Sequence, residues 1–215
     1  MTQAAPKILT FDAFVTQYGD NDRYELIDGE LIDMEPTGPH EEVAAFIVRK
    51  ANIEIDLFEI SASADRLNLR WFTQQCCIIK PLGTATAFKP DVAVIDKASL
   101  AKEPLWQNEP IITFGSTVKL VVEVVSTNWQ NGYARKVEDY GAMGISEYWI
   151  VDYLGLGGRD YIGTPKQPTV SVYRLSDNGD RYQSPAQFRG RNRLVSPTFP
   201  ELTLTAQDIF AAGQP

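Results

Sequence analysis

Two carboxylates and a lysine stand in or beside apolar segments of this sequence, where an isolated charge is costly. Asp91 follows a proline and begins an apolar run, while Glu123 lies within the valine-rich run 119–125. Lys136 follows thirteen residues after Glu123, in a segment with helical spacing. Burying a carboxylate without a partner typically costs several kcal/mol, because the charge loses its hydration. These residues therefore indicate a metal-dependent hydrolytic site rather than ordinary core.

The chemistry that this set could support is the hydrolysis of a phosphodiester. That reaction needs a water made nucleophilic, stabilisation of charge on phosphorus and a stabilised leaving oxygen, and one or two Mg²⁺ ions can supply all three. Mg²⁺ prefers oxygen ligands, so Asp91 and Glu123 are the predicted ligands. The backbone carbonyl of Val124 is the third ligand that we expect from the protein. Mn²⁺ is the alternative ion. Lys136 would orient the water or offset the charge that develops on the phosphate.

Two further residues could support this site. His40, the one histidine of the sequence, follows Pro39 at the expected start of a helix. It is either a capping or loop residue or a residue that approaches the metal site or a phosphate from that helix. Glu25 lies in an expected hairpin strand, where it either occupies a solvated edge or faces the site. The sequence leaves these alternatives open.

The charge of the chain restricts the classes of partner. The 215 residues carry a net charge of −8 with a pI near 4.7, which argues against a nucleic-acid binder that uses its whole surface. A local basic groove, or carboxylates neutralised by a metal, is compatible with that charge. The densest basic group, Arg189, Arg191 and Arg193, is either a solvated loop or a set of phosphate contacts.

Membrane and redox signals point to an ordinary cytoplasmic protein. No apolar run approaches the roughly 18 residues needed to span a bilayer, and no hydrophobic signal region follows the N-terminus. Cys76 and Cys77 are adjacent in an expected strand, so their side chains point to opposite faces and are poorly placed to pair. We expect reduced thiols, with one or both buried. A zinc site is not supported, because the sequence has one histidine and no second cysteine pair.

Periodicity and turn residues predict an α/β order of elements. Helices are expected at 11–18, with Thr10 as N-cap, at 40–58, and at 133–143, where Gly144 ends the helix. A hairpin is expected from strands 23–27 and 30–34 around Asp28-Gly29. Further strands are expected from 66 onward and at 75–80, 91–95, 119–125 and 147–152. Near the C-terminus we expect an antiparallel pair, 169–175 with 179–183. A short strand and a helix follow within 202–210, capped by Thr205 with Asp208 in the capping-box position.

Pro90-Asp91, Glu123-Val-Val125 and the downstream Lys136 resemble a variant of the PD-(D/E)XK nuclease pattern. Six short motifs follow one another along most of the chain: Tyr24-Glu-Leu-Ile-Asp-Gly-Glu30, Pro36-Thr-Gly-Pro-His40, Lys89-Pro-Asp91, Val122-Glu-Val-Val-Ser126, Lys136-x-x-x-Tyr140 and Gly144-Ile-Ser-Glu-Tyr-Trp-Ile-Val-Asp152. Through these motifs the sequence is similar, more specifically, to the large bacterial family of Uma-type putative restriction endonucleases. Each motif is weak alone, but their order and spacing together are specific.

The resemblance implies a restriction-endonuclease-like α/β (α+β) fold, in which a mixed central sheet is flanked by helices, with an αβββαβ core and extra β-hairpins. It also implies that Asp91 and Glu123 are metal ligands. Val125 occupies the position where the superfamily usually places its catalytic lysine, so in this family the lysine has moved to the following helix and Lys136 replaces it. A second departure is Asn131, because relatives often carry an aspartate just ahead of the helical lysine.

The domain organisation expected from these elements is a single restriction-endonuclease-like domain over residues 1–215. It comprises an N-terminal helix and hairpin (1–35), a nuclease core (36–152) and a β-rich C-terminal extension (153–215). The length fits one domain of ordinary size.

The leading functional expectation is an Mg²⁺-dependent endonuclease that hydrolyses phosphodiester bonds in DNA. By analogy with nucleases that cut both strands, we expect a homodimer. The alternative is a catalytically inactive nuclease-fold protein with a binding or regulatory role, which Val125, Asn131 and the acidic composition favour. A metal-dependent hydrolase of another small phosphate ester is a weaker expectation, because the sequence contains no substrate-specific motif.

Overall fold

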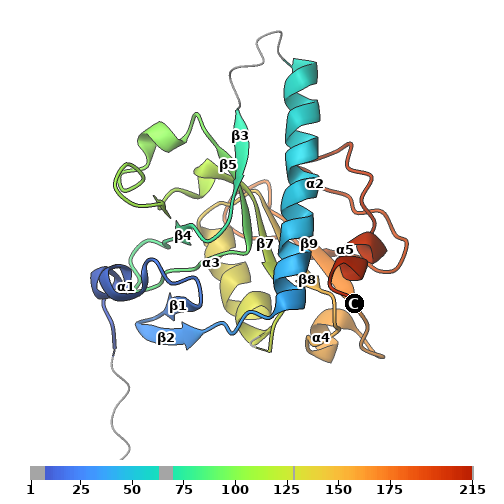
Figure 1. Cartoon of the computed structure of the whole chain (residues 1–215), viewed down its shortest axis with the longest axis horizontal. Helices are drawn as coiled ribbons and strands as arrows, with labels where there is room; N and C mark the ends of the chain where they lie inside the picture. Colours follow the sequence, from blue (N-terminus) through green and yellow to red (C-terminus); the bar gives the residue numbers. More distant parts are fainter. Residues whose placement is uncertain (1–7, 63–69, 128, 215) are drawn as a thin grey trace, which may run out of the picture.

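A six-stranded mixed sheet is the centre of the computed structural model, which describes residues 8–62, 70–127 and 129–214 (Figure 1). The strand order is β10-β9-β8-β7-β5-β3. The strands are β3 (Trp71–Gln74), β5 (Val92–Asp96), β7 (Val118–Val124), β8 (Glu147–Asp152), β9 (Thr169–Arg174) and β10 (Ala186–Phe188). β7 and β8 pair in parallel, while the other neighbouring strands pair antiparallel.

The middle strands are buried on both faces, because their sequences are nearly continuous apolar runs. One face packs against α2 (Gly38–Ala62) and α5 (Ala206–Ala212). The other face packs against a π-helical segment, η3 (Asn131–Lys136), and against α3 (Val137–Ala142). Figure 1 shows α2 running across the sheet with α5 beside it. Taken in chain order, α2, β3, β5, β7, α3 and β8 form the expected αβββαβ core.

The first two helices follow the local sequence signals. α1 (Phe11–Tyr18) has the expected bounds, and Thr10 Oγ1 accepts a hydrogen bond from Ala13 N at 3.2 Å. α2 is longer than the expected 40–58. It begins at Gly38, because a proline such as Pro39 is tolerated in a first helical turn, and it meets no helix-breaking residue before Ala62. Val43, Ile47, Ala51 and Ile55, four positions apart, are buried, and Ala44 is buried beside them.

The helix expected at 133–143 is present with a different start. Trp129 and Gln130 are already helical, and the next six residues, Asn131–Lys136, form a π-helix rather than an α-helix. Such wide turns are rare and often lie at functional sites. Gly144, with φ of +79°, follows the end of α3 as expected.

The N-terminal hairpin is confirmed and lies outside the central sheet. β1 (Tyr24–Ile27) and β2 (Glu30–Asp33) pair antiparallel, and the turn residues Asp28 and Gly29 have φ of +51° and +85°. A bridge between Leu26 and Ala87 joins the hairpin to the chain just before β5. A second small sheet pairs β4 (Ile78–Ile79) in parallel with β6 (Ile111–Ile112). The connection around β6 also contains η1 (Leu100–Lys102) and η2 (Gly115–Thr117).

The strand expected at 75–80 is reduced to β4. Cys76 has φ of +57°, which breaks an extended strand, so the two cysteines do not alternate across a sheet as predicted. Both thiols are free, Cys77 is buried and Cys76 is partly exposed. The strand expected from 66 onward is present as β3 from Trp71, and its expected first residues, 66–69, lie outside the described residues.

The predicted C-terminal pair is present only in part. β9 forms as expected and pairs with β8 and β10, while 179–183 adds one antiparallel bridge between Leu175 and Tyr182 and a backbone bond from Gln183 N to Arg174 O at 2.9 Å. Tyr182 also stacks on Tyr148, with ring centroids 6.0 Å apart, so this segment packs on the aromatic face of the sheet. A short helix, α4 (Arg159–Ile162), precedes β9.

The final helix has the predicted cap but no preceding strand. Residues 202–204 form no strand, since Thr205 makes one isolated bridge to Arg193. Thr205 and Asp208 form the predicted capping box of α5. Within the part of the chain that the structure describes, no helix is long and apolar enough to cross a membrane.

Candidate functional site

A cavity of about 220 Å³ opens where β5 begins and β7 ends, beside the first turn of α2. Four of the predicted site residues line it: His40, Asp91, Glu123 and Val124. The complete lining is Asp22, Arg23, Met34, Pro36, His40, Glu41, Gln75, Cys76, Lys89, Asp91, Glu123, Val124 and Ser126. The cavity is therefore the candidate functional site.

The antiparallel pairing of β5 and β7 brings the two predicted carboxylates together. Val92 is opposite Val122, and one further step of this register sets Asp91 beside Glu123 on the same face. Asp91 Oδ2 accepts a hydrogen bond from the backbone N–H of Val124 at 2.6 Å. Burial raises the pKa of Asp91, while His40 and this N–H act in the opposite direction.

Lys136 reaches the predicted carboxylate from the helix. Its Nζ donates to Glu123 Oε2 at 2.7 Å and to Glu25 Oε1 at 2.8 Å. Glu25, Glu123 and Lys136 are 0%, 6% and 1% exposed, so the contacts are shielded from water. The structure thus groups three predicted residues into one buried network. Glu25 faces the network rather than a solvated strand edge.

Tyr140 completes the surroundings of Glu123. Its hydroxyl donates to Glu123 Oε1 at 2.8 Å, so both carboxylate oxygens of Glu123 are hydrogen-bonded. The sequence analysis named Tyr140 only as the end of the motif Lys136-x-x-x-Tyr140 and gave it no role at the site. The signal that could have identified it was the spacing of four residues from Lys136, which places the two side chains on one face of a helix.

The network contains two carboxylates and one ammonium, so one carboxylate retains a proton more readily than usual. Burial raises the pKa of Glu123 to about 8; Lys136 opposes the rise and the charge of Glu25 adds to it. Burial lowers the pKa of Lys136, but Glu123 and Glu25 outweigh it and hold that pKa above its ordinary value. Lys136 is therefore charged at neutral pH, while Glu123 can exchange a proton there.

The N-terminal hairpin is bonded to η3 at two consecutive helix residues. Lys136 contacts Glu25, and Arg135 Nη2 donates to Asp28 Oδ1 at 2.8 Å. Arg135 Nε also donates to Asp139 Oδ2 at 2.7 Å within the helix. These bonds hold the wide helical turn against the hairpin and direct Lys136 toward the sheet.

Lys89 is a further buried cation that sequence reasoning did not assign to the site. Its backbone N–H donates to Glu25 Oε1 at 2.7 Å. Its Nζ donates to the carbonyls of Tyr18, Gly19 and Asn21 at 2.7–2.9 Å, which fixes the chain after α1. Burial lowers the pKa of Lys89. Since its ammonium is already bonded to these carbonyls, Lys89 positions Glu25 rather than acting on a ligand.

His40 lies at the junction of α2 with β7. Its Nε2 lies 3.1 Å from the carbonyl oxygen of Val124 and 3.6 Å from Asp91 Oδ2. The side chain is 8% exposed. His40 therefore lies beside two of the predicted metal-binding groups. Of the two alternatives that the sequence left open, this is a residue that approaches the predicted metal site from the start of the helix.

The donor set fits an oxygen-preferring divalent ion in part. Asp91, Glu123 and the Val124 carbonyl line one cavity and present the hard oxygens that such ions bind. Across the described residues, no group of three His, Cys, Asp or Glu side chains is spaced to hold a metal. A site here would thus need the carbonyl and water as ligands, and Glu123 would have to release an oxygen from Lys136 or Tyr140.

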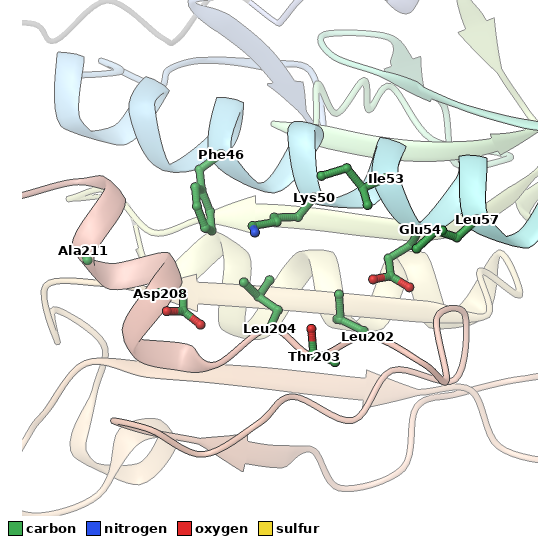
Figure 2. Close-up of a pocket in the computed structure, with 10 residues that line it drawn as sticks. All are labelled: Phe46, Lys50, Ile53, Glu54, Leu57, Leu202, Thr203, Leu204, Asp208 and Ala211. Atoms are coloured by element: carbon green, nitrogen blue, oxygen red, sulfur yellow. The ribbon is translucent and has the colours of Figure 1, made fainter.

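A larger cavity, of about 450 Å³, contains none of the predicted site residues. It lies between α2 and the segment that leads into α5, and Figure 2 shows the side chains of these two segments facing one another. Its lining combines apolar residues such as Phe46, Leu202 and Leu204 with Lys50, Glu54 and Asp208. Its charged side chains, Lys50, Glu54 and Asp208, are not part of the bonded network around Glu123.

Two of the three arginines in the basic C-terminal loop, 189–193, make hydrogen bonds that hold neighbouring segments in place. Arg189 Nε donates to Thr169 Oγ1 at 2.9 Å, and its Nη2 donates to the carbonyl of Ile162 at 2.8 Å. Arg193 Nε donates to the carbonyl of Leu202 at 2.5 Å. Arg191 is exposed. The trio therefore does not form a set of three cations directed at a ligand.

Comparisons with known proteins agree with this picture. Residues 11–207 match the model of the Uma2 family, described as "Putative restriction endonuclease". No curated protein matches the sequence. Among solved structures, the chain is similar to one described as a "putative nuclease belonging to DUF820" from Anabaena variabilis. The TM-score is 0.68 and the identity 18%, over 95% of this chain and 99% of that chain. At this identity the likeness concerns the fold, and the predicted family and fold class are confirmed.

Proposed function

We propose that this chain, which belongs to the Uma2 family of restriction endonucleases, is a metal-dependent endonuclease that hydrolyses phosphodiester bonds in DNA. The observation that carries the proposal is the 2.7 Å contact between Lys136 Nζ and Glu123 Oε2. It supports a catalytic role for Lys136, since the lysine that is missing at position 125 is supplied from the helix. The nuclease-like fold and the family's description support the reaction class.

The residues would divide the work as follows. Asp91, Glu123 and the Val124 carbonyl would hold Mg²⁺ or Mn²⁺, which when bound activates water and neutralises phosphate charge. Lys136, which does not line the cavity, would act from behind Glu123, where its buried ammonium, fixed by Glu25 and Glu123, offsets the negative charge that develops on the phosphate. Glu25 holds that ammonium in place, and Tyr140 fixes the orientation of Glu123.

Cleavage of supercoiled plasmid in Mg²⁺ or Mn²⁺ tests the proposal, with EDTA as the metal-free arm. We expect nicked and linear products from the wild type. Asp91→Asn and Glu123→Gln should each lower the rate at least about a hundredfold, since a catalytic ion contributes several kcal/mol. Asp177→Asn and Glu109→Gln neutralise exposed carboxylates elsewhere and are the matched controls. Equal cleavage by the wild type and both site variants would contradict the proposed site.

The same proposal includes the preferred nucleic acid and the oligomeric state of the active protein. The preferred nucleic acid is DNA, so the plasmid should be cleaved faster than an RNA of matched length. The active form is a homodimer, since two sites are needed to cut both strands of a duplex. Sedimentation of the purified protein should then give twice the mass of one chain, and a monomer that still cuts both strands would count against this point.

A second candidate function, a nuclease-fold binding or regulatory protein without catalysis, is favoured by one observation. Both oxygens of Glu123 are already bonded, to Lys136 and Tyr140, so the carboxylate is satisfied without a metal. This candidate predicts DNA retention in a filter or gel-shift assay without cleavage in either ion. The plasmid assay therefore separates the two functions.

A further inference from the structure

His40 is placed as a ligand would be, although its residue type does not belong to an all-oxygen site. It comes from the first turn of α2, and its ring is almost fully buried. Its Nε2 is directed at the cavity, where it meets the Val124 carbonyl and Asp91 Oδ2. These are two of the three groups that are proposed to hold the ion.

The spacing of the three atoms is that of neighbouring ligands. Two ligands at right angles, each about 2.1 Å from an ion, lie about 3.0 Å apart. His40 Nε2 is 3.1 Å from the Val124 oxygen and 3.6 Å from Asp91 Oδ2. The first distance fits one edge of a coordination shell, and the second exceeds it by about half an ångström, which a small turn of the Asp91 carboxylate would close. His40 Nε2 therefore lies at or near ligand spacing from both oxygens.

The other ring nitrogen is consistent with the same role. His40 Nδ1 is buried and makes no hydrogen bond among the described residues, and the nearest carboxylate oxygen, Glu41 Oε1, lies 3.5 Å away. Histidines that bind metals commonly donate their second N–H to a carboxylate, which fixes the tautomer and the ring. A small rotation of Glu41, whose side chain is 58% exposed, would supply that partner.

We propose that His40 binds the divalent ion directly through Nε2, next to Asp91 and the Val124 carbonyl, and that this nitrogen makes the site prefer Mn²⁺ to Mg²⁺. The preference follows from ligand type, because imidazole binds transition-metal ions well whereas Mg²⁺ selects oxygen. The inference rests on the metal site of the proposed function, and it goes further by naming a ligand and the ion that it selects.

The sequence allows an unusually direct test, because His40 is its one histidine. Protein labelled with ¹⁵N-histidine, with any affinity tag removed, carries the label in this residue alone. Mn²⁺ is added without substrate, and electron spin-echo modulation reports the nitrogen bound to it. We expect coupling to one histidine nitrogen that changes from the ¹⁴N to the ¹⁵N pattern on labelling. Asp91→Asn should abolish the bound signal.

Binding constants provide the second readout. Loss of a carboxylate behind a metal-bound histidine alone typically costs about 10–100-fold in affinity. His40→Ala should therefore raise the Kd for Mn²⁺ at least about tenfold and the Kd for Mg²⁺ by less. Glu41→Gln should weaken Mn²⁺ in the same direction, while Glu42→Gln, on the neighbouring exposed residue, should not.

The outcomes of these experiments test the metal site and the role of His40 separately. Mn²⁺ that binds in an Asp91-dependent manner without histidine coupling overturns the role of His40 and leaves the metal site standing. Absence of any bound Mn²⁺ in the wild type overturns both the ligand and the metal site. Histidine coupling without plasmid cleavage supports the ligand and contradicts the nuclease function. Because the labelling needs no substitution, a failure of His40→Ala to fold does not affect the result.

Discussion

Lys136 Nζ lies 2.7 Å from Glu123 Oε2, although Val125 occupies the position where the lysine of the related sequence pattern would stand. Val125 is 6% exposed and packs into the cluster of apolar residues on the α3 face of the sheet. A charge at that position would disrupt this packing, whereas η3 carries Lys136 over the same face. Glu123 is therefore paired with a lysine from the helical segment and not with a residue of its own strand.

Lys136→Met should destabilise the protein and abolish cleavage. The substitution leaves two carboxylates buried without their cation, and breaking a buried ion pair in this way typically costs about 3–5 kcal/mol. Urea unfolding in EDTA measures the loss, and the plasmid assay below the unfolding midpoint measures activity. Lys102→Met, at an exposed position, is the control and should change neither. If Lys136→Met is as active and as stable as the wild type, the contact between Lys136 and Glu123 contributes to neither catalysis nor stability, which would contradict the proposed function.

Glu123 should make the metal-free protein less stable as the pH rises through the neutral range. The pKa of its carboxyl is about 8 in the folded protein and 4.5 as the ordinary value. The folded state therefore holds a proton that the unfolded chain releases. This contribution is complete below pH 4.5 and is lost as the pH rises toward 8, at a slope of up to about 1.4 kcal/mol per pH unit.

The measurement is the free energy of unfolding of wild type minus that of Glu123→Gln, at several pH values in EDTA. Taking the difference removes the parallel contribution of Asp91, whose pKa is also raised by burial. The difference should fall steadily from pH 5 to pH 8. A flat difference, or one that rises with pH, would mean that Glu123 is an ordinary ionised partner of Lys136.

The two ion pairs between the hairpin and η3, Glu25 with Lys136 and Asp28 with Arg135, should contribute different amounts to the free energy of unfolding. Glu25→Gln removes the buried negative charge that pairs with Lys136. Its amide oxygen can keep the bonds from Lys89 N and Lys136 Nζ, but its N–H₂ is left buried without an acceptor where Glu25 Oε2 has no partner, which should cost about 1–3 kcal/mol. Asp28→Asn removes an exposed partner of Arg135, and exposed ion pairs contribute about 0.2–1 kcal/mol. Asparagine also tolerates the positive φ of Asp28. Equal losses for the two variants would show that burial does not determine the strength of these bonds.

The parts of the fold that the sequence predicted well depend on local patterns. The turn at Asp28-Gly29 requires positive φ at both residues, and these residue types adopt it readily. The valine-rich runs predicted the middle strands to within one residue at each end. Glu123 and Lys136 were identified because a charge in apolar surroundings needs a partner, and the structure supplies that partner.

The parts that were missed depend on contacts between distant segments. Glu25 and Lys136 are 111 positions apart, so no periodicity could show that they touch. The pairing of β9 with β10 was missed because a turn at 177–178 favoured the nearer segment. The hydrogen bonds from Lys89 Nζ were missed because their acceptors are backbone carbonyls, which are present in every residue and give no sequence signal. The π-helical geometry of η3 likewise has no signature in its residue types.

Glu147 should stabilise the fold without affecting the site. It is fully buried at the start of β8 and accepts hydrogen bonds from Trp149 Nε1, Ser196 Oγ and Thr198 N. Glutamine would present an amide N–H₂ to at least one of these donors, which should cost about 1–3 kcal/mol and loosen the segment that leads to α5. Glu147→Gln should therefore lower the unfolding midpoint in urea while Mn²⁺ affinity, measured below that midpoint, stays at the wild-type value. Glu109→Gln is the exposed control for stability. A Glu147→Gln protein that unfolds at the wild-type midpoint but binds Mn²⁺ more weakly would place Glu147 in the site network rather than in the support of the C-terminal segment.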